Sequence, residues 1–193
     1  MSYTPRILAF AGSLRAESYN KKLIRIAASG AEAAGARVTL IDLSEYRLPI
    51  FDEDLEKADG MPVNGRKLKD LMLAHEGLLL ACPEYNSSIT AVLKNTIDWT
   101  SRAQNGEPAL ACYKGKTAVI MSASPGALGG LRGLVAVRSI LGNIQVTVLP
   151  NQIAIAKANE AFGPDGNLLD EAKQKAVLGL GETLARTLAK LHA

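Results

Sequence analysis

Short apolar runs alternate along this chain with longer segments in which apolar residues recur every three or four positions. Five of the short runs are bounded by Gly, Pro or Ser and predict β-strands at residues 6–11, 37–43, 77–82, 116–122 and 144–149. The first and third runs are almost continuously apolar, which is typical of strands that are covered on both faces of a sheet.

The segments between these runs have the period of amphipathic helices. Helices are predicted at residues 20–34, 65–75, 91–102, 129–141 and 168–191. The last one shows the period most clearly, because its apolar residues form a single stripe, made of Val177, Leu180, Leu184, Leu188 and Leu191. Gly35 is placed to end the first helix, and residues 44–63 are predicted to form a long surface loop.

Strand and helix alternate five times, and right-handed crossovers then return each strand in the same direction. The predicted fold is therefore α/β, a doubly wound parallel sheet with helices on both faces, formed by residues 1–193 as one domain. Ligands of such sheets bind beyond the carboxyl ends of the strands. The loops after the first, third and fourth strands are thus the ones to examine for a binding site.

Composition and charge narrow the class of protein. The excess of 22 basic over 19 acidic residues gives a net charge of +3, too small and too scattered to indicate a nucleic-acid partner. No apolar stretch approaches the roughly 20 residues that span a bilayer, and no targeting peptide is recognisable at the N-terminus. Cys82 and Cys112 lack metal or redox spacing, which favours a reducing cytoplasm as the location.

The loop after the first predicted strand has the residues of an anion site. Cations near a helix N-terminus are unfavourable, by roughly 0.3–1 kcal/mol each, unless an anion is held there. This loop and the first helical turn supply three cations and three neutral donors, namely Arg15, Lys21 and Lys22 with Ser13, Ser18 and Asn20. GxGxxG and GK[ST] sequences are both absent, so the pattern favours a terminal phosphate monoester over a dinucleotide or a nucleoside triphosphate.

Two alternatives remain open for this region. Ser18 or Asn20 is suited to be an ordinary N-cap, in which case the lysines are simply solvated. Asp42, near the end of the second strand, is suited to contact a ribose, but without the glycines of a dinucleotide-binding loop it reads better as an acid that starts a loop.

The loops after the third and fourth strands are suited to a flat ligand. Residues 82–88 contain Pro83, which shapes the backbone, and are rich in hydrogen-bonding groups that can meet the edge of a heterocycle. Residues 122–130 are small and glycine-rich, which allows the backbone to approach a planar ligand closely. Each loop taken alone is also compatible with an ordinary turn.

With these loops read together, the chain resembles the NADPH-dependent FMN reductase family, whose relatives include bacterial quinone, chromate and azo-dye reductases. The resemblance rests on GSLRAESYN from Gly12, on PEYNSS from Pro83 followed by LKNTIDW from Leu93, and on SASPGALGGLR from Ser122. One departure is that Thr90-Ala91 stand where the family often has Pro-Gly.

The resemblance implies a flavodoxin-like sheet with strand order 2-1-3-4-5 and a homodimer or homotetramer. It implies FMN as cofactor, NADPH or NADH as electron donor, and a quinone, free FMN, an azo dye or chromate as the small-molecule acceptor. The implied FMN-binding residues are Ser13, Arg15, Ser18 and Asn20 for the phosphate, Pro83, Glu84, Tyr85 and Asn86 for the ring edge, and Ser124 with Gly126 closing over it. No catalytic side chain and no metal is expected, because the flavin carries the chemistry.

Other residues and functions have weaker claims. Tyr85 is equally suited to wall the ring or to pack at a subunit contact, whereas Asp98 and Trp99 are expected to be structural and Cys82 inert. A flavodoxin-type electron carrier shares the fold, but such carriers tend to be strongly acidic. A phospho-receiver domain requires an acidic pair after the first strand, where Gly12 and Ser13 stand.

Overall fold

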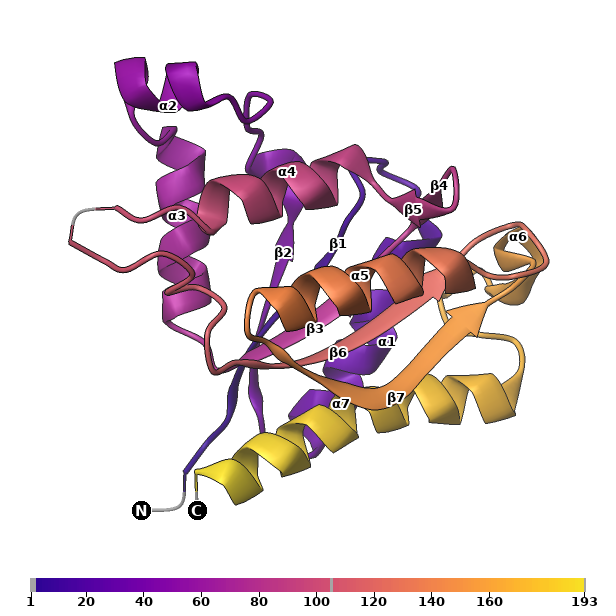
Figure 1. Cartoon of the computed structure of the whole chain (residues 1–193). Coiled ribbons are helices and arrows are strands. Elements are labelled where there is room, and N and C mark those ends of the chain that lie inside the picture. The colour runs from indigo at the N-terminus through magenta and orange to yellow at the C-terminus, as the bar shows by residue number, and fades with distance from the viewer. Residues whose placement is uncertain (1–2, 105, 193) are drawn as a thin grey trace.

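A five-stranded parallel sheet forms the centre of the protein in the computed structural model, which describes residues 3–104 and 106–192 (Figure 1). Its strands lie in the order β2-β1-β3-β6-β7, which confirms the predicted order 2-1-3-4-5. Four of them end within one residue of the prediction: β1 (Arg6–Ala11), β2 (Arg37–Asp42), β3 (Gly77–Ala81) and β6 (Thr117–Ala123).

The fifth strand corrects the prediction. Strand β7 spans Thr147–Ile155 instead of residues 144–149, so it continues through Pro150. A proline cannot donate to a sheet ladder, but β7 is an edge strand, and its register with β6 shifts between Ala118 and Ile120. The strand therefore accommodates Pro150, although a proline in the sequence usually indicates the end of a strand.

All five predicted helices are present, with ends that differ from the prediction by up to three residues: α1 (Tyr19–Ala33), α3 (Val63–Leu73), α4 (Ala91–Thr100), α5 (Leu131–Asn143) and α7 (Glu171–Leu191). The prediction of a continuous loop over residues 44–63 was wrong, because this segment contains α2 (Glu53–Asp59) after the short 3-10 helix η1 (Leu43–Glu45). The carboxylate of Asp52 caps α2 by accepting from Asp54 N at 2.8 Å. Helix α2 buries none of its residues, so its sequence carries no apolar period.

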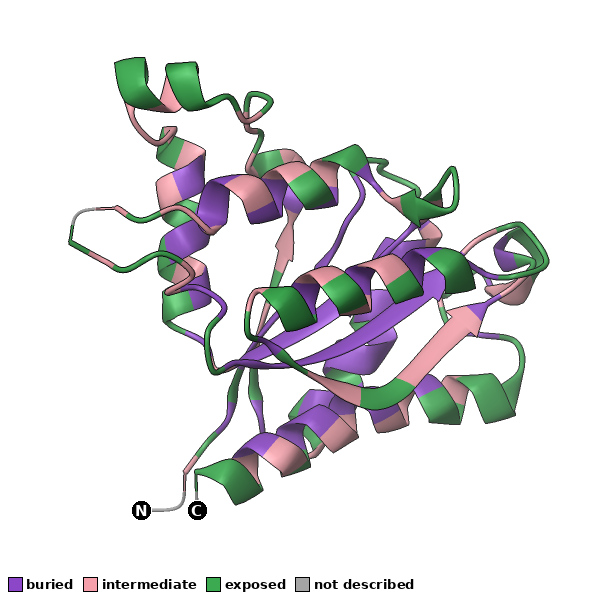
Figure 2. Ribbon diagram, in the orientation of Figure 1, coloured by how far each residue is buried: buried purple, intermediate pink, exposed green. Residues whose placement is uncertain are grey.

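The sheet separates two apolar cores (Figure 2). Alternate residues of β1 point to opposite faces, so Ile7 and Ala9 pack with α1 and α7, while Leu8 and Phe10 pack with α3, α4 and α5. Among the described residues, no helix has both the length and the apolar character needed to cross a membrane.

Helices α1 and α7 lie in unusually close contact on their face of the sheet. A Cβ atom added at Gly30 would lie 2.0 Å from Leu178 O, and one added at Gly181 would lie 1.8 Å from Ala27 O. Only glycine permits this approach of the two backbones. Gly35, with φ +88°, ends α1 as predicted: its N–H donates to Glu32 O at 2.9 Å.

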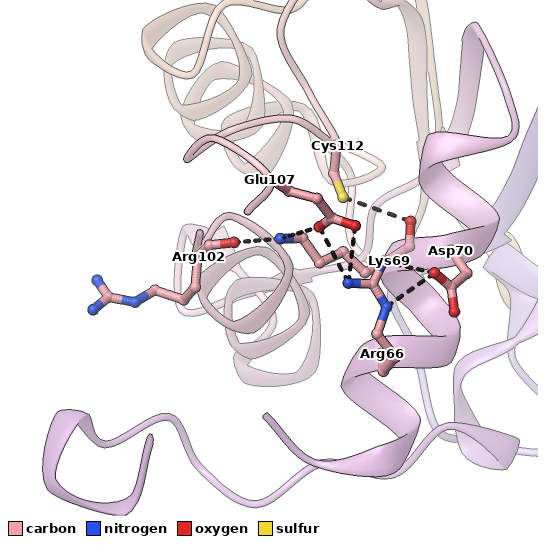
Figure 3. Close-up of polar contacts among 6 residues, drawn as sticks. All are labelled: Arg66, Lys69, Asp70, Arg102, Glu107 and Cys112. Carbon is pink, nitrogen blue, oxygen red and sulfur yellow. Dashed lines mark hydrogen bonds and ion pairs between the residues drawn. The ribbon is translucent and has the colours of Figure 1, made fainter. Parts of the chain in front are cut away.

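An ion-pair cluster fastens the segment that follows α4 to helix α3 (Figure 3). Lys69 is fully buried, and its Nζ lies 3.0 Å from Glu107 Oε2 and 2.5 Å from Arg102 O. Arg66 bridges Glu107 and Asp70, at 3.1 and 2.6 Å. The hydrogen bonds from Arg66 and Lys69 hold the pKa of Glu107 below its usual value. The cluster thus compensates a buried lysine charge far along the sheet from the predicted loops.

Candidate ligand-binding site

Three loops that are distant in the sequence meet in one pocket at the carboxyl end of the sheet. The pocket has a volume of about 100 Å³, and the loops after β1, β3 and β6 form it. Its lining residues are Ser13, Arg15, Ser18, Tyr19, Asn20, Pro83, Glu84, Tyr85, Ala123, Ser124 and Pro125. Asn86 lies just outside, in a groove that shares Tyr85, and Gly126 lies behind Ser124, whose Oγ accepts from its N–H at 3.3 Å.

The first loop is a turn fixed from both sides. Gly12 N donates to Ala81 O at 2.9 Å, and Thr90 Oγ1 donates to Gly12 O at 2.7 Å. A Cβ at position 12 would lie 3.0 Å from the Cβ of Leu93, so a glycine suits the turn. Thr90 is also the N-cap of α4, because its Oγ1 accepts from Leu93 N at 3.3 Å.

Donors on this turn are available to a ligand. Ser18 occupies the N-cap position of α1, yet its side chain makes no capping hydrogen bond. Ser18 is therefore at the place of an ordinary capping serine, but its hydroxyl does not cap the helix. Arg15 is exposed, and within residues 3–104 and 106–192 no carboxylate pairs with it. The Oγ of Ser13 accepts from Arg15 N at 3.3 Å and helps shape the turn.

Asn20 and Lys21 have partners that the sequence does not reveal. Asn20 Nδ2 donates to Ala123 O at 2.8 Å and its Oδ1 accepts from Ala123 N at 3.0 Å, so this side chain joins α1 to the end of β6. The Nζ of Lys21 lies 2.6 Å from Asp42 Oδ2. The charge of Lys21 is therefore balanced by Asp42. Of the three cations that indicated an anion site, Lys21 no longer counts as evidence for a bound anion.

Of the two roles considered for Asp42, contact with a ribose or the start of a loop, the structure shows the second. Its Oδ1 accepts from Ser44 N at 2.9 Å at the start of η1. Burial alone raises the pKa of this carboxyl, but the hydrogen bonds from Lys21 and Ser44 together outweigh it and lower the pKa below its usual value. Asp42 is thus engaged on both oxygens within the protein.

The second loop is a tight β-hairpin, which the sequence analysis missed. Strands β4 (Glu84–Tyr85) and β5 (Ser88–Ile89) pair antiparallel around a two-residue turn. Asn86 and Ser87 both have left-handed backbones, with φ of 51° and 67°, as two-residue hairpin turns require. The Asn between short polar segments is the one sequence feature that could have indicated a hairpin turn. Strands of two residues are too short to show an alternation of apolar and polar positions.

The carboxylate of Glu84 is directed away from the pocket. Its Oε1 accepts from Arg132 Nη2 at 2.6 Å and its Oε2 accepts from Gly133 N at 3.1 Å. Burial favours the neutral acid, but these hydrogen bonds lower the pKa of Glu84 below its usual value. Only the backbone and the aliphatic part of Glu84 are therefore left to face a ligand.

The third loop is held against β7 and opens helix α5. Ser124 N donates to Ile155 O at 3.0 Å. Gly129 and Gly130 have φ of 62° and 94°, and a Cβ on Gly129 would lie 2.6 Å from the carbonyl carbon of Ile155. The glycines seen in the sequence thus serve the close packing of this turn as well as access to the pocket.

The LKNTIDW segment serves to anchor a neighbouring loop. Trp99 is fully buried, and its Nε1 donates to Pro49 O at 2.9 Å. Asn95 donates to the same oxygen at 2.8 Å and accepts from Phe51 N at 2.8 Å. Asp98 pairs with Lys94 on the helix surface at 2.7 Å. Trp99 therefore anchors the neighbouring loop, as expected of a structural residue, whereas the structural role expected of Asp98 stays a prediction.

The titratable and metal-binding side chains near the sheet have identifiable surroundings. Burial raises the pKa of the Cys82 thiol to about 12, which favours the protonated form and agrees with the expectation of an unreactive thiol. His75 is engaged with Leu71 O and Thr39 Oγ1 under the opposite end of the sheet. No cluster of metal-binding side chains occurs among residues 3–104 and 106–192.

Comparison with known proteins gives consistent matches. The family model described as NADPH-dependent FMN reductase matches residues 5–160. The chain is 35% identical over 178 residues to an NAD(P)H-dependent FMN reductase of Pseudomonas aeruginosa, covering 92% of this chain and 91% of the relative. It is 38% identical over 171 residues to a probable NADPH:quinone oxidoreductase of Oryza sativa, covering 86% and 82%.

A solved structure extends the likeness to three dimensions. The flavoenzyme NAD(P)H:(acceptor) oxidoreductase of Paracoccus denitrificans superposes with a TM-score of 0.81 at 27% identity, covering 97% of this chain and 98% of that one. The similarity of fold therefore extends over nearly the full length of both chains.

Proposed function

The chain belongs to the NADPH-dependent FMN reductase family, and we propose that it binds FMN in the three-loop pocket and passes two electrons from NADPH or NADH to a small acceptor. The acceptor class is a quinone, with free FMN, azo dyes and chromate as further candidates. The observation that carries the proposal is the convergence of the three loops on one pocket. On the first loop, the hydroxyl of Ser18 makes no capping hydrogen bond, and Arg15 pairs with no carboxylate of residues 3–104 and 106–192.

The residues fit a bound FMN by their chemistry. Arg15 and the hydroxyls of Ser13 and Ser18 would surround the phosphate at the N-terminus of α1, where the helix dipole also favours an anion. The hairpin backbone at Pro83–Asn86 would meet the edge of the ring, and Ser124 with Gly126 would close over it. Asn20 would support the phosphate mainly through its hold on Ala123.

When bound, FMN supplies the hydride-accepting chemistry, so the protein has to supply binding, orientation and electrostatics. Tyr85 is 54% exposed beside the pocket, and its ring is suited to border the face at which donor and acceptor enter. Donor and acceptor would use this one face in turn, which predicts ping-pong kinetics. A flavodoxin-type carrier is disfavoured, because the relatives are named as reductases.

The same proposal covers assembly and location. We propose one FMN-binding domain over residues 1–193, of which residues 1, 2, 105 and 193 lie outside the described part of the structure. We propose a homodimer or homotetramer that buries the apolar side chains exposed on and before α5, which are Leu128, Leu131 and Val135. A cytoplasmic location fits the two buried, unpaired thiols of Cys82 and Cys112.

Anaerobic visible spectroscopy of the purified, FMN-loaded protein tests the function. The expected result is a flavin spectrum that bleaches on addition of NADPH or NADH and returns on addition of a quinone. Bleaching that requires a reductase protein and not the nicotinamide would support the carrier instead. A wild-type protein that takes up no FMN would contradict the proposal altogether.

A further inference from the structure

One side chain joins two of the three loops of the pocket. Glu84 belongs to the hairpin after β3, while its partners Arg132 and Gly133 open α5 directly after the 124–130 turn. Arg132 donates to Oε1 from Nε at 2.9 Å and from Nη2 at 2.6 Å, and Gly133 N donates to Oε2 at 3.1 Å. Only 8% of the Glu84 side chain is exposed, whereas 58% of the Arg132 side chain is, so the carboxylate is held on the protein side while the guanidinium faces solvent.

The N-terminus of α5 is shaped to receive this carboxylate. Its N-cap residue is Gly130, which has no side chain to cap the helix, so the anionic cap comes from Glu84 on another element. A Cβ at Gly133 would lie 3.2 Å from the Cβ of Glu84 and from Ser88 O. The glycines of the GGLRG segment therefore let the hairpin approach the helix closely enough for the bonds to form.

The turn at residues 12–20, which is proposed to bind the phosphate, takes no part in this contact. Residues 12–20 are held by Ala81, Thr90 and Ala123, none of which bonds to Glu84 or Arg132. The hydrogen bonds that hold the 12–20 turn are therefore different from those that join the hairpin to α5, although Thr90 and Ala123 directly adjoin the hairpin and the 124–130 turn. Loss of either set of hydrogen bonds should affect the binding of one end of the ligand more than that of the other.

We propose that Glu84 and Arg132 are positioning residues for the flavin ring: their ion pair locks the 84–89 hairpin and the 124–130 turn into one rigid unit. This inference rests on the proposed function. Neither side chain transfers a proton or an electron. Their effect is exerted through the backbone of the two loops, which the ion pair holds in a fixed relation across the ring.

Flavin titrations of Glu84→Gln, Arg132→Gln and the double variant test the inference. Riboflavin shares the ring but lacks the phosphate, so its Kd and that of FMN should rise by the same factor, about tenfold, in Glu84→Gln. The rate of flavin reduction at saturating NADPH should fall as well. The double variant should be no weaker than the weaker single variant, because both substitutions remove one interaction.

The matched control removes an ion pair remote from the pocket. Glu182 and Arg186 pair at 2.5 Å on the exposed side of α7, and Glu182→Gln with Arg186→Gln should leave both flavin affinities and the reduction rate unchanged. A Glu84→Gln protein with a lower melting temperature but wild-type riboflavin affinity and reduction rate would overturn the inference, as would fully additive effects of the two substitutions. Failure of the wild type to bind either flavin would instead refute the proposed function.

Discussion

Lys21 and Asp42 show how a charge at a helix N-terminus is balanced within the protein. The Lys21 side chain is only 9% exposed, and an ammonium group so placed needs an opposite charge nearby. Asp42 provides it at 2.6 Å from the end of the neighbouring strand. The pair therefore ties the start of α1 to the end of β2. Arg15 and Lys22 are the two cations of this segment that pair with no carboxylate of the described residues, and of these only Arg15 lines the pocket.

The Asp42→Asn substitution tests this pairing through its pH dependence. The pKa of Asp42 is lowered in the folded state, so the carboxylate stabilises the protein above its unfolded pKa of about 3.9. This contribution is lost as pH falls through the lower folded-state value. We expect Asp42→Asn to reduce the free energy of unfolding by about 1 kcal/mol at pH 7, and the difference from wild type to shrink below about pH 4.

Urea unfolding of both proteins between pH 3 and pH 8 provides the measurement. A difference that stays constant down to pH 3 would mean that the Asp42 charge is not responsible. Glu171→Gln is a suitable control, because Glu171 is exposed and makes no ion pair with the described residues.

Single residues also mark the limit of what the sequence reveals. Residue type and loop position selected Ser13, Arg15 and Ser18, because hydroxyls and a guanidinium at a helix N-terminus suit an anion, and the structure places all three in the lining of one pocket. Asn20 was selected on the same grounds, but its partner Ala123 lies 103 positions away. A hydrogen bond between such distant residues leaves no local pattern.

Helices α1 and α7 depend on two glycines at their contact. Gly30 and Gly181 stand where any side chain would collide with the backbone of the other helix. In sequence, a glycine within a helix reads as a weakness of roughly 1 kcal/mol relative to alanine. Here the close packing that the two glycines allow between the helices compensates that cost in stability.

A pair of alanine substitutions on α7 separates these two effects. Gly181→Ala should lower the free energy of unfolding by at least about 2 kcal/mol, because its Cβ would lie 1.8 Å from Ala27 O. Gly179→Ala, two residues earlier, meets nothing within 4 Å and should raise it by about 0.5–1 kcal/mol. Thermal or urea unfolding measures both, and equal effects of the two substitutions would contradict the packing account.

Elements were predictable where they bury an apolar face. The five main strands are short apolar runs and the five main helices have an apolar period of 3.6 residues, because the helices cover both faces of the sheet. Helix α2 and the β4–β5 hairpin were missed for opposite reasons: α2 buries no residue, and each hairpin strand has only two. Ion pairs from Arg102 hold α2, and hydrogen bonds from the start of α5 hold the hairpin. Contacts between residues so far apart in the chain leave no local sequence pattern.

At the scale of the whole molecule, an apolar surface on and before α5 suggests assembly. Leu131 and Val135 are one helical turn apart, and Val135 is 66% exposed. Val135→Glu should therefore shift the protein toward monomer in sedimentation experiments without changing its fold. Val63→Glu is the matched control, because Val63 is 72% exposed at the start of α3. A wild-type protein that is monomeric, or that is unaffected by Val135→Glu, would contradict an interface there.

The strand order and the position of the ligand edge followed from the alternation of strands and helices together with the family resemblance. The pocket itself required the structure, since only the fold shows that residues 13, 83 and 124 line one cavity. The central claim is that this cavity holds FMN by its phosphate.

The most direct measurement is a fluorescence titration of the apoprotein with FMN and with riboflavin, performed on wild type and on Arg15→Ala. We expect wild type to prefer FMN strongly, and Arg15→Ala to weaken FMN binding by about 10- to 100-fold while leaving riboflavin binding nearly unchanged. Arg186→Ala, which removes an exposed arginine remote from the pocket, should change neither affinity. Equal affinity of the wild type for the two flavins, or no binding of either, would contradict the claim.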